Sequence, residues 1–294
     1  MKTLHFHVGS ERCGSTFIQS FFNEPQVKDT LANFSITFDI DIYFALGKLS
    51  PITGLDKKTF RPIRDDLFAR HKKAPAKAVF TTQELLFGLA HEKGVANRCP
   101  AMCEAIEYLA DGFDTRIVIV LRRQDTFIES LYNQLLKHGE TRDFRDFVGD
   151  LPLDNYQWDR VVDTYAGHFG ADRVTVVPFE GRVLAGVGCE NFIEGVFKAI
   201  DLPMKVDISA LPIKNPSLPP RALEIQRLAN RLLPLAEAET LAKHFVDTMP
   251  KNPGEKYELF DPDRRAELLA GYRDSNRRLF SAYLPACDAA YYLG

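Results

Sequence analysis

The chain has 294 residues, and its 37 Lys and Arg against 40 Asp and Glu give a formal net charge of −3. This near-balance argues against a protein that coats nucleic acid by bulk charge, although it leaves room for a local basic groove. Hydrophobic residues make up 45% and charged residues 26% of the sequence, a composition that excludes a disordered chain.

The N-terminal segment and the cysteines bear on where the protein works. The first residues, MKTLHFHVG, lack the apolar stretch of a signal peptide, and no window approaches the roughly 20 uninterrupted apolar residues that span a bilayer. The five cysteines are odd in number and do not form a disulfide pattern, so a reducing compartment is expected. We therefore expect a soluble, cytoplasmic protein, unless a missing upstream segment anchored it.

The first unit is predicted to be a strand, a glycine-containing loop and a helix. Residues 3–8 alternate in polarity, and His5 and His7 lie opposite the apolar side of the predicted strand. The loop spans residues 9–16. Apolar side chains then recur at helical spacing from Phe17 onward.

Three further apolar runs predict strands, at residues 76–80, 116–121 and 173–177. The second of these, RIVIVL, is a continuous β-branched run of the kind that helices cover on both faces of a parallel sheet. Apolar periodicity predicts helices at 101–109, 126–137, 161–169, 190–200, 221–233 and 263–284. The proline-rich segment from about 201 to 220 is expected to be a loop. Residues 236–262 give no clear pattern, and 23–75 carry no readable motif.

Strands that alternate with helices predict an α/β fold of three layers, with a central, mostly parallel sheet. We expect one domain over residues 1–294, with a helical C-terminal part from about 221. Ligands of such sheets bind beyond the carboxyl ends of the strands. The loops at 9–16, 81–84 and 122–125 should therefore converge on one cleft.

The loop contains two glycines, Gly9 and Gly14, with the G-x4-G spacing of a phosphate-binding loop. Glycine lets the backbone turn sharply, and successive N–H groups at a helix start form a cradle for an anion. A nucleoside-triphosphatase loop has lysine after its second glycine, whereas here Ser15 follows and the cation inside the loop is Arg12. The alternative interpretation is a tight turn in which Ser15 or Thr16 caps the helix.

The segment HVGSERCGSTFIQ resembles the 5′-phosphosulfate loop of the sulfotransferase family, particularly its bacterial and carbohydrate-type members. The residues that fit the family pattern are His7, Gly9, Gly14, Ser15, Thr16 and Gln19. Arg12 stands where the family usually has lysine. The resemblance implies a P-loop-like nucleotide-binding architecture. It also implies a donor site that includes Gly9, Ser10, Glu11, Arg12, Cys13, Gly14, Ser15 and Thr16.

The stretch IVIVLRRQDTFIES is the second part of the resemblance. Family members place an arginine at the end of a buried strand and a serine eight residues later, and both grip the 3′-phosphate of the donor nucleotide. Arg122 and Ser130 match that spacing. A guanidinium suits the role because its fork matches phosphate geometry and stays charged. The alternative is that Arg122 and Arg123 are solvated charges and that Ser130 is an ordinary helix residue.

Glu84 follows another predicted strand end, in the segment TTQE. Carbohydrate-type sulfotransferases often carry a glutamate there as the general base. An acceptor hydroxyl needs such a base, and partial burial raises the pKa of a carboxylate toward a useful range. The alternative role is the glutamate of a capping box that starts at Thr81. His7 is the second candidate for the base.

The resemblance thus implies a sulfotransferase that moves a sulfuryl group from 3′-phosphoadenosine 5′-phosphosulfate (PAPS) to a hydroxyl or amine of a carbohydrate or small-molecule acceptor. The product nucleotide is adenosine 3′,5′-bisphosphate (PAP). Arg12 and the backbone of residues 12–16 would stabilise the leaving phosphate, and arginine would do so without donating a proton. No metal is expected, since no metal-binding acid set appears and Cys99 and Cys103 lack a second ligand pair.

Two other functions stay open at this point. One is a nucleoside-triphosphate kinase on a similar sheet, which the missing lysine of the loop disfavours. The other is a non-catalytic nucleotide-binding protein. The sequence does not identify the acceptor or the oligomeric state, and the segment 23–75 is expected to shape the acceptor pocket.

Overall fold

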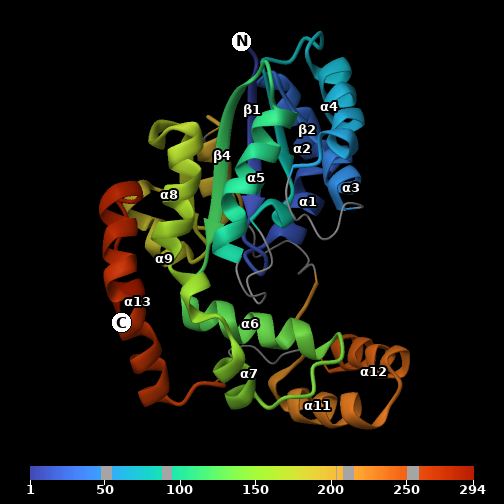
Figure 1. The fold of residues 1–294 in the computed structure, drawn as a ribbon, viewed down its shortest axis with the longest axis vertical. Coiled ribbons are helices and arrows are strands. Elements are labelled where there is room, and N and C mark those ends of the chain that lie inside the picture. The colour runs from blue at the N-terminus through green and yellow to red at the C-terminus, as the bar shows by residue number, and fades with distance from the viewer. Residues whose placement is uncertain (48–54, 88–94, 203, 208–214, 250–257) are drawn as a thin grey trace.

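The computed structural model describes residues 1–47, 55–87, 95–202, 204–207, 215–249 and 258–294. At its centre is a sheet of five strands in the order β2-β3-β1-β4-β5, and every neighbouring pair is parallel (Figure 1). The strands are β1 (Thr3–Gly9), β2 (Ile36–Asp39), β3 (Ala78–Thr82), β4 (Asp114–Leu121) and β5 (Val174–Pro178).

Helices connect and follow these strands. In the first half of the chain they are α1 (Ser15–Phe22), α2 (Pro25–Asn33), α3 (Asp41–Gly47), α4 (Lys57–His71), α5 (Val95–Leu109) and α6 (Gln124–Leu136). In the second half they are α7 (Phe144–Asp150), α8 (Trp158–Phe169), α9 (Gly181–Leu184), α10 (Phe192–Ala199), α11 (Leu223–Leu232), α12 (Leu235–Thr248), α13 (Pro262–Tyr283) and α14 (Ala290–Leu293). A 3₁₀ turn, η1 (Glu84–Leu86), follows β3, and another, η2 (Leu153–Tyr156), precedes α8.

Helices cover both faces of the sheet, which confirms the predicted three-layer α/β fold. On one face, Phe22 of α1 packs against Phe80 of β3 and Phe197 of α10, with ring centroids 4.7 and 5.0 Å away. On the other face, α5 and α8 lie side by side (Figure 1). Because both faces are covered, the polar residues of β1 are buried as well as its apolar ones, and His5 and His7 are almost fully enclosed.

The four predicted strands are confirmed as β1, β3, β4 and β5, with ends shifted by one or two residues. The edge strand β2 was not predicted, because its four residues are too few to show a periodicity. Helix α12 occupies part of the segment that gave no clear pattern, and Glu84 begins a 3₁₀ turn rather than a longer helix. In the proline-rich segment, residues 203 and 208–214 lie outside the described residues.

A buried group of ion pairs fixes α13 against α6. Asp125 of α6 is fully buried and accepts hydrogen bonds from Arg123, at 2.6 Å, and from Arg265 of α13. Arg265 also pairs with Glu129 at 2.7 Å. Burial would raise the pKa of Asp125, but the hydrogen bonds and charge of Arg123 hold it below its ordinary value. The C-terminal part is thereby attached beside the carboxyl end of β4.

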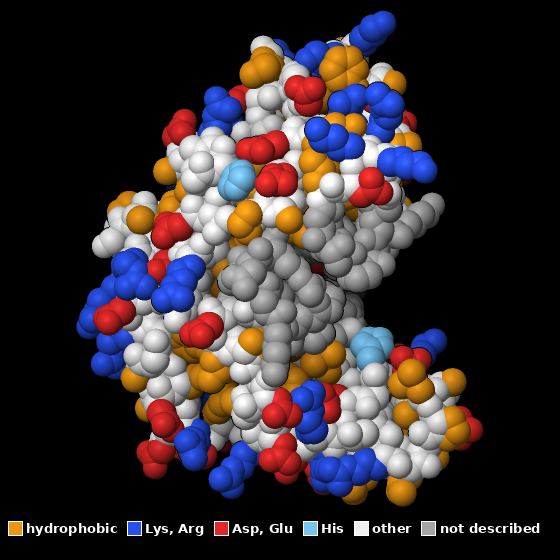
Figure 2. Space-filling model, viewed as in Figure 1, with side chains coloured by type: hydrophobic (Ala, Val, Ile, Leu, Met, Phe, Trp, Pro, Cys, Tyr) orange, Lys and Arg blue, Asp and Glu red, His pale blue; other side chains and the backbone are white. Residues whose placement is uncertain are grey.

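Charged side chains of both signs are interspersed on the face drawn in Figure 2, in keeping with the small net charge. No helix in the described part of the chain is long and apolar enough to cross a membrane.

We predict that Asp125→Asn lowers the free energy of unfolding by about 3 kcal/mol, because it leaves the partly buried charges of Arg123 and Arg265 without their shared partner. Denaturant unfolding followed by circular dichroism measures the change. Asp274→Asn is the matched control, since it breaks only the exposed Asp274–Arg277 pair and should cost less than about 0.5 kcal/mol. Equal losses in the two variants would contradict the structural role of the buried group.

Candidate functional site

The strand order places two loops together at one point of the sheet. The chain leaves β1 toward the β2 edge and leaves β4 toward the β5 edge, so the crevice between β1 and β4 is the topological switch point, where ligands of parallel sheets bind. The Ser10 backbone N–H donates to the Val120 carbonyl at 2.9 Å, and that of Gln83 donates to the His7 carbonyl at 2.9 Å. The loops predicted to converge, after β1, β3 and β4, do lie together.

Both glycines of the loop have backbone angles that favour glycine. Gly9 has φ +121°, and a Cβ there would lie 3.3 Å from the Glu84 carbonyl oxygen, so the loop packs closely on the chain after β3. Gly14 has φ +83°, and its Cβ would lie 2.6 Å from the Phe192 ring. The first helical N–H bond, from Ile18 to the Gly14 carbonyl, leaves the preceding N–H groups of the α1 start without helical partners. A turn of this kind at a helix start is suited to an anion.

The side chains of the loop divide into inward and outward groups. Ser15 Oγ donates to the Ser10 carbonyl at 3.2 Å, and Ser10 Oγ lies 2.9 Å from Cys13 Sγ. Burial raises the pKa of Cys13 to about 12, so its thiol is a packing group and not a nucleophile. Thr16 is exposed at the start of α1, while Glu11 is partly buried.

Arg122 lies next to the loop, as the sequence predicts. Its Nη1 donates to the Arg12 carbonyl at 3.4 Å and its Nε to Thr126 Oγ1 at 3.1 Å. The guanidinium also lies over the Phe179 ring, 5.1 Å from the centroid. The adjacent Arg123 points elsewhere, to Asp125 and the Tyr291 carbonyl. The structure thus separates a structural arginine from one that faces the loop.

The Arg12 side chain crosses from the loop to α6. Its Nε donates to Ser130 Oγ at 3.1 Å and its Nη1 to Gln134 Oε1 at 3.0 Å. The structure therefore brings Arg12, Arg122 and Ser130 together. It also adds Gln134, which the sequence analysis did not single out, although its spacing of four from Ser130 on a helix could have indicated it.

Lys137 is a second residue that sequence reasoning missed. It follows α6 on the face that carries Gln134, and its Nζ donates to Asn215 Oδ1 at 2.7 Å. Burial and the positive charge of Arg12 lower the pKa of Lys137 to about 8. A lysine held near a second cation in this way is suited to bind an anion.

Glu84 lies on the other side of the glycine loop. Gln19 Nε2, from α1, donates to Glu84 Oε2 at 2.8 Å. Burial raises the pKa of Glu84 above its ordinary value of 4.5, and the charge of Glu11 adds to the rise. A half-buried carboxylate with a raised pKa, held in place by one amide, has the properties of a general base.

His7 is fully buried beneath the same region. Its Nδ1 lies 2.8 Å from Thr82 Oγ1, and its Nε2 has no hydrogen-bond partner among the residues that the structure describes. Burial lowers the pKa of His7 to about 3, because the charged imidazolium is costly in a dry environment. The ring is therefore neutral at physiological pH and far less accessible than Glu84.

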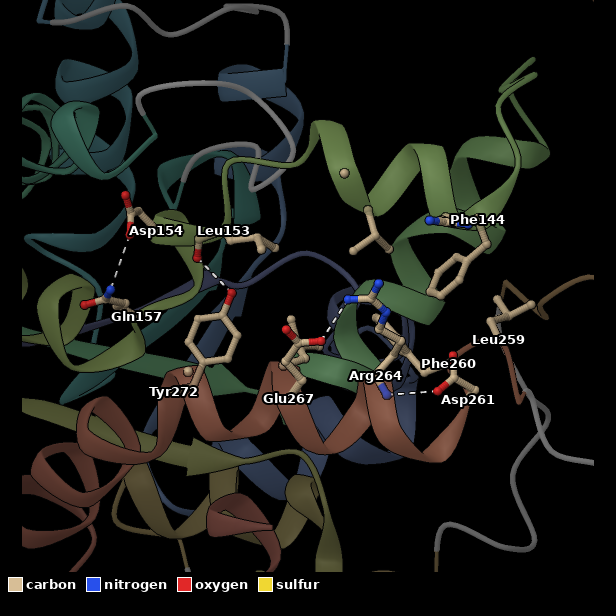
Figure 3. A pocket seen from close by; sticks show the side chains of 15 residues that line it. Phe144, Leu153, Asp154, Gln157, Leu259, Phe260, Asp261, Arg264, Glu267 and Tyr272 are labelled. Atoms are coloured by element: carbon tan, nitrogen blue, oxygen red, sulfur yellow. Dashed lines mark hydrogen bonds and ion pairs between the residues drawn. The ribbon is translucent and has the colours of Figure 1, made fainter.

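A cavity of about 690 Å³ lies away from these residues, between α7 and α13 (Figure 3). Its wall includes Phe144, Leu153, Phe260 and Tyr272, and the Tyr272 hydroxyl donates to the Leu153 carbonyl at 2.9 Å. None of the predicted site residues lines it. The candidate site is thus the region at the carboxyl ends of β1, β3 and β4 and not this cavity.

In the described ranges, no group of three or more His, Cys, Asp or Glu side chains could hold a metal ion. No protein-family model matches the chain, and no curated protein matches it. Among solved structures, the chain is similar to a crystal structure of a sulfotransferase from Alicyclobacillus acidocaldarius, with a TM-score of 0.48 and 16% sequence identity over 96% of this chain and 95% of that one. At this level of similarity, the match assigns neither a family nor an activity to the present chain.

We predict that the pKa of His7 lies below its ordinary value and that the pKa of Glu84 lies above its ordinary value. The His7 ring should stay neutral from about pH 5 to 8, because its pKa is near 3, while the carboxyl of Glu84 should titrate above 4.5. An NMR pH titration with labelled histidine and glutamate side chains measures both. A His7 midpoint near 6.5, the ordinary value, would show that this ring is not enclosed as described.

Proposed function

We propose that the protein is a sulfotransferase that uses PAPS as donor and a hydroxyl or amine of a carbohydrate or small molecule as acceptor. The observation that carries the proposal is the meeting of two segments that are far apart in the chain and are each suited to bind an anion. Arg122, at the end of β4, donates to the carbonyl of Arg12 in the glycine loop, and Arg12 in turn donates to Ser130. Such a pair of elements matches a nucleotide that carries phosphate groups on both sides of its ribose.

The two elements bind the two ends of the donor. The glycine loop from Gly9 to Thr16 and the start of α1 face the 5′-phosphosulfate with backbone N–H groups and the Thr16 hydroxyl. Arg122 and Ser130 bind the 3′-phosphate, and Arg12 completes the cationic part of the donor site. Fixing both ends orients the sulfur for an in-line attack and removes much of the entropic part of the barrier.

Glu84 is the general base in this proposal. The acceptor oxygen or nitrogen forms a bond to sulfur, the bond between sulfur and the 5′-phosphate oxygen breaks, and the acceptor proton passes to the Glu84 carboxylate. The leaving phosphate departs as PAP, and the loop N–H groups stabilise the charge that builds on it. Gln19 holds the Glu84 carboxylate in place through its 2.8 Å hydrogen bond. The proposed chemistry is positioning and electrostatic stabilisation, as in phosphoryl transfer, with no step that needs a metal.

His7 has a supporting role in this scheme. Its neutral ring, held against Thr82 at 2.8 Å, fills the space beneath the loop and keeps the carboxyl ends of β1 and β3 in register. Within the segment 23–75, helix α3 contributes to the acceptor side, since its Tyr43 carbonyl accepts a hydrogen bond at 2.9 Å from Gln83 Nε2, next to Glu84 in the chain. Residues 48–54 of this segment lie outside the described residues.

The proposed donor site predicts selective binding of PAP. PAP at about 100 times its dissociation constant should stabilise the protein by about 2.7 kcal/mol and raise the melting temperature by roughly 5 °C, while AMP and ATP with magnesium should do much less. A thermal-shift series with the three nucleotides measures this. Stabilisation by ATP with magnesium, and none by PAP, would favour a kinase instead.

The matched variants for that series are Arg122→Ala and Arg116→Ala. Arg122→Ala removes the proposed 3′-phosphate contact and should weaken PAP by about 2–4 kcal/mol. Arg116 lies near the opposite end of β4, beside Asp114, so its loss should leave nucleotide binding unchanged.

The proposed role of Glu84 as the base predicts a loss of rate on its replacement. Glu84→Gln should lower the rate of PAP release from PAPS, with a panel of hydroxyl and amine acceptors, by about 10²- to 10⁴-fold, and should leave PAP affinity unchanged. Glu24→Gln, an exposed residue before α2, is the control and should keep the full rate. A Glu84→Gln variant with the full rate would remove Glu84 from the mechanism. A wild-type protein that binds PAP but turns over no donor would instead be a non-catalytic nucleotide-binding protein.

A further inference from the structure

The direction of the Arg12 side chain indicates whether it would contact the 5′-phosphosulfate or the 3′-phosphate of the donor. Arg12 has φ +61°, in the left-handed region, at the top of the glycine loop. From there its guanidinium spans one turn of α6, with Nε on Ser130 Oγ at 3.1 Å and Nη1 on Gln134 Oε1 at 3.0 Å. Ser130 and Gln134 are four residues apart and lie on one face of that helix. The charge of Arg12 therefore lies beside α6.

Arg122 reinforces this placement. Its Nη1 donates to the Arg12 carbonyl, 3.4 Å away, so the backbone of Arg12 is attached to the end of β4 while its side chain reaches α6. Arg122 Nε donates to Thr126, one turn before Ser130 on α6, so the two guanidinium groups lie along one face of that helix.

Lys137 extends the group, and we call Arg12, Arg122 and Lys137 the cation cluster. Lys137 lies three residues after Gln134, which accepts a hydrogen bond from Arg12 Nη1 at 3.0 Å, so the two cations lie along the same side of α6. Its hydrogen bonds go to two neutral oxygens, Asn215 Oδ1 at 2.7 Å and the Pro216 carbonyl at 3.3 Å. In the described part of the chain, neither Lys137 nor Arg122 forms an ion pair with a carboxylate, whereas the neighbouring Arg123 is paired with Asp125.

Placing Arg122 and Lys137 beside Arg12, without a carboxylate partner for either of those two among the described residues, has an electrostatic cost, and a doubly charged phosphate relieves that cost better than any neutral partner. An arginine fork can exchange its bonds to Ser130 and Gln134 for two bonds to phosphate oxygens without moving its backbone. In the proposed function, Ser130 and Arg122 bind the 3′-phosphate of the donor. This phosphate would therefore lie next to the cation cluster.

We propose that Arg12 is a ligand of the 3′-phosphate, together with Arg122 and Ser130, and not the cation of the 5′-phosphosulfate. This inference rests on the proposed function. It implies that the loop backbone and the start of α1, rather than an arginine side chain, stabilise the leaving 5′-phosphate. It also makes Arg12 one of the residues that select 3′-phosphorylated nucleotides over otherwise identical ones.

The experiment compares PAP with AMP, which differs only by the missing 3′-phosphate, using isothermal titration calorimetry. Arg12→Ala should weaken PAP about 10- to 100-fold, as expected for lost hydrogen bonds between charged groups, and should change AMP affinity less than about threefold. Equal weakening of both nucleotides would place Arg12 at the shared 5′-phosphate and overturn the inference.

A second variant, Arg12→Lys, keeps the proposal testable if Arg12→Ala fails to fold. Arg12→Lys keeps the charge but loses the fork, so it should fold with the wild-type melting temperature and fall between wild type and Arg12→Ala in its preference for PAP over AMP. If Arg12→Lys weakens both nucleotides alike, the inference is again wrong. Arg116→Ala is the control and should change neither affinity.

The wild-type titration separates this inference from the proposed function. A wild-type protein that fails to bind PAP contradicts the donor site itself. A wild-type protein that prefers PAP, combined with variants of Arg12 that lose both nucleotides equally, contradicts the role of Arg12 alone.

Discussion

The parallel pairing of β1 with β4 is the constraint on which the candidate site depends. It aligns Thr3 with Asp114 at one end and Gly9 with Ile119 at the other, so the glycine loop and Arg122 leave the sheet side by side although they lie more than a hundred residues apart. The helices that cover both faces bury this pairing and fix its register. Everything proposed for the donor site follows from the two loops sharing one edge of the sheet.

Two adjacent arginines at the carboxyl end of β4, Arg122 and Arg123, have different surroundings. Arg123 donates to Asp125 and the Tyr291 carbonyl, and so attaches the C-terminal part to α6. Arg122 instead faces the loop and the Phe179 ring. The first arginine is paired with a buried carboxylate, while the second has no carboxylate partner in the described part of the chain and is the one proposed to bind the donor. On the opposite side of the loop, Glu84 is held by Gln19, so the cationic and the carboxylate parts of the site are separated by the loop itself.

Much of this arrangement could be predicted from the sequence, because it depends on local patterns. The four longer strands have strong apolar runs, the two glycines have their own spacing, and the interval from Arg122 to Ser130 places them at the end of a strand and on the following helix. What could not be predicted depends on tertiary contacts. Strand β2 is too short to show a period, and the turn of the Arg12 side chain toward Gln134 follows from the packing of α6 against the loop. The burial that makes His7 neutral likewise requires helices on both faces of β1.

In the proposed donor complex, the loop at the end of β1 and the residues after β4 bind opposite ends of one nucleotide. A crystal structure of the protein with PAP tests this arrangement most directly. We expect the 5′-phosphate over the loop from Gly9 to Thr16 and the 3′-phosphate within hydrogen-bond distance of Arg122 and Ser130. A nucleotide seated in the cavity between α7 and α13, or bound in the crevice with Arg122 turned away from both phosphates, would contradict it.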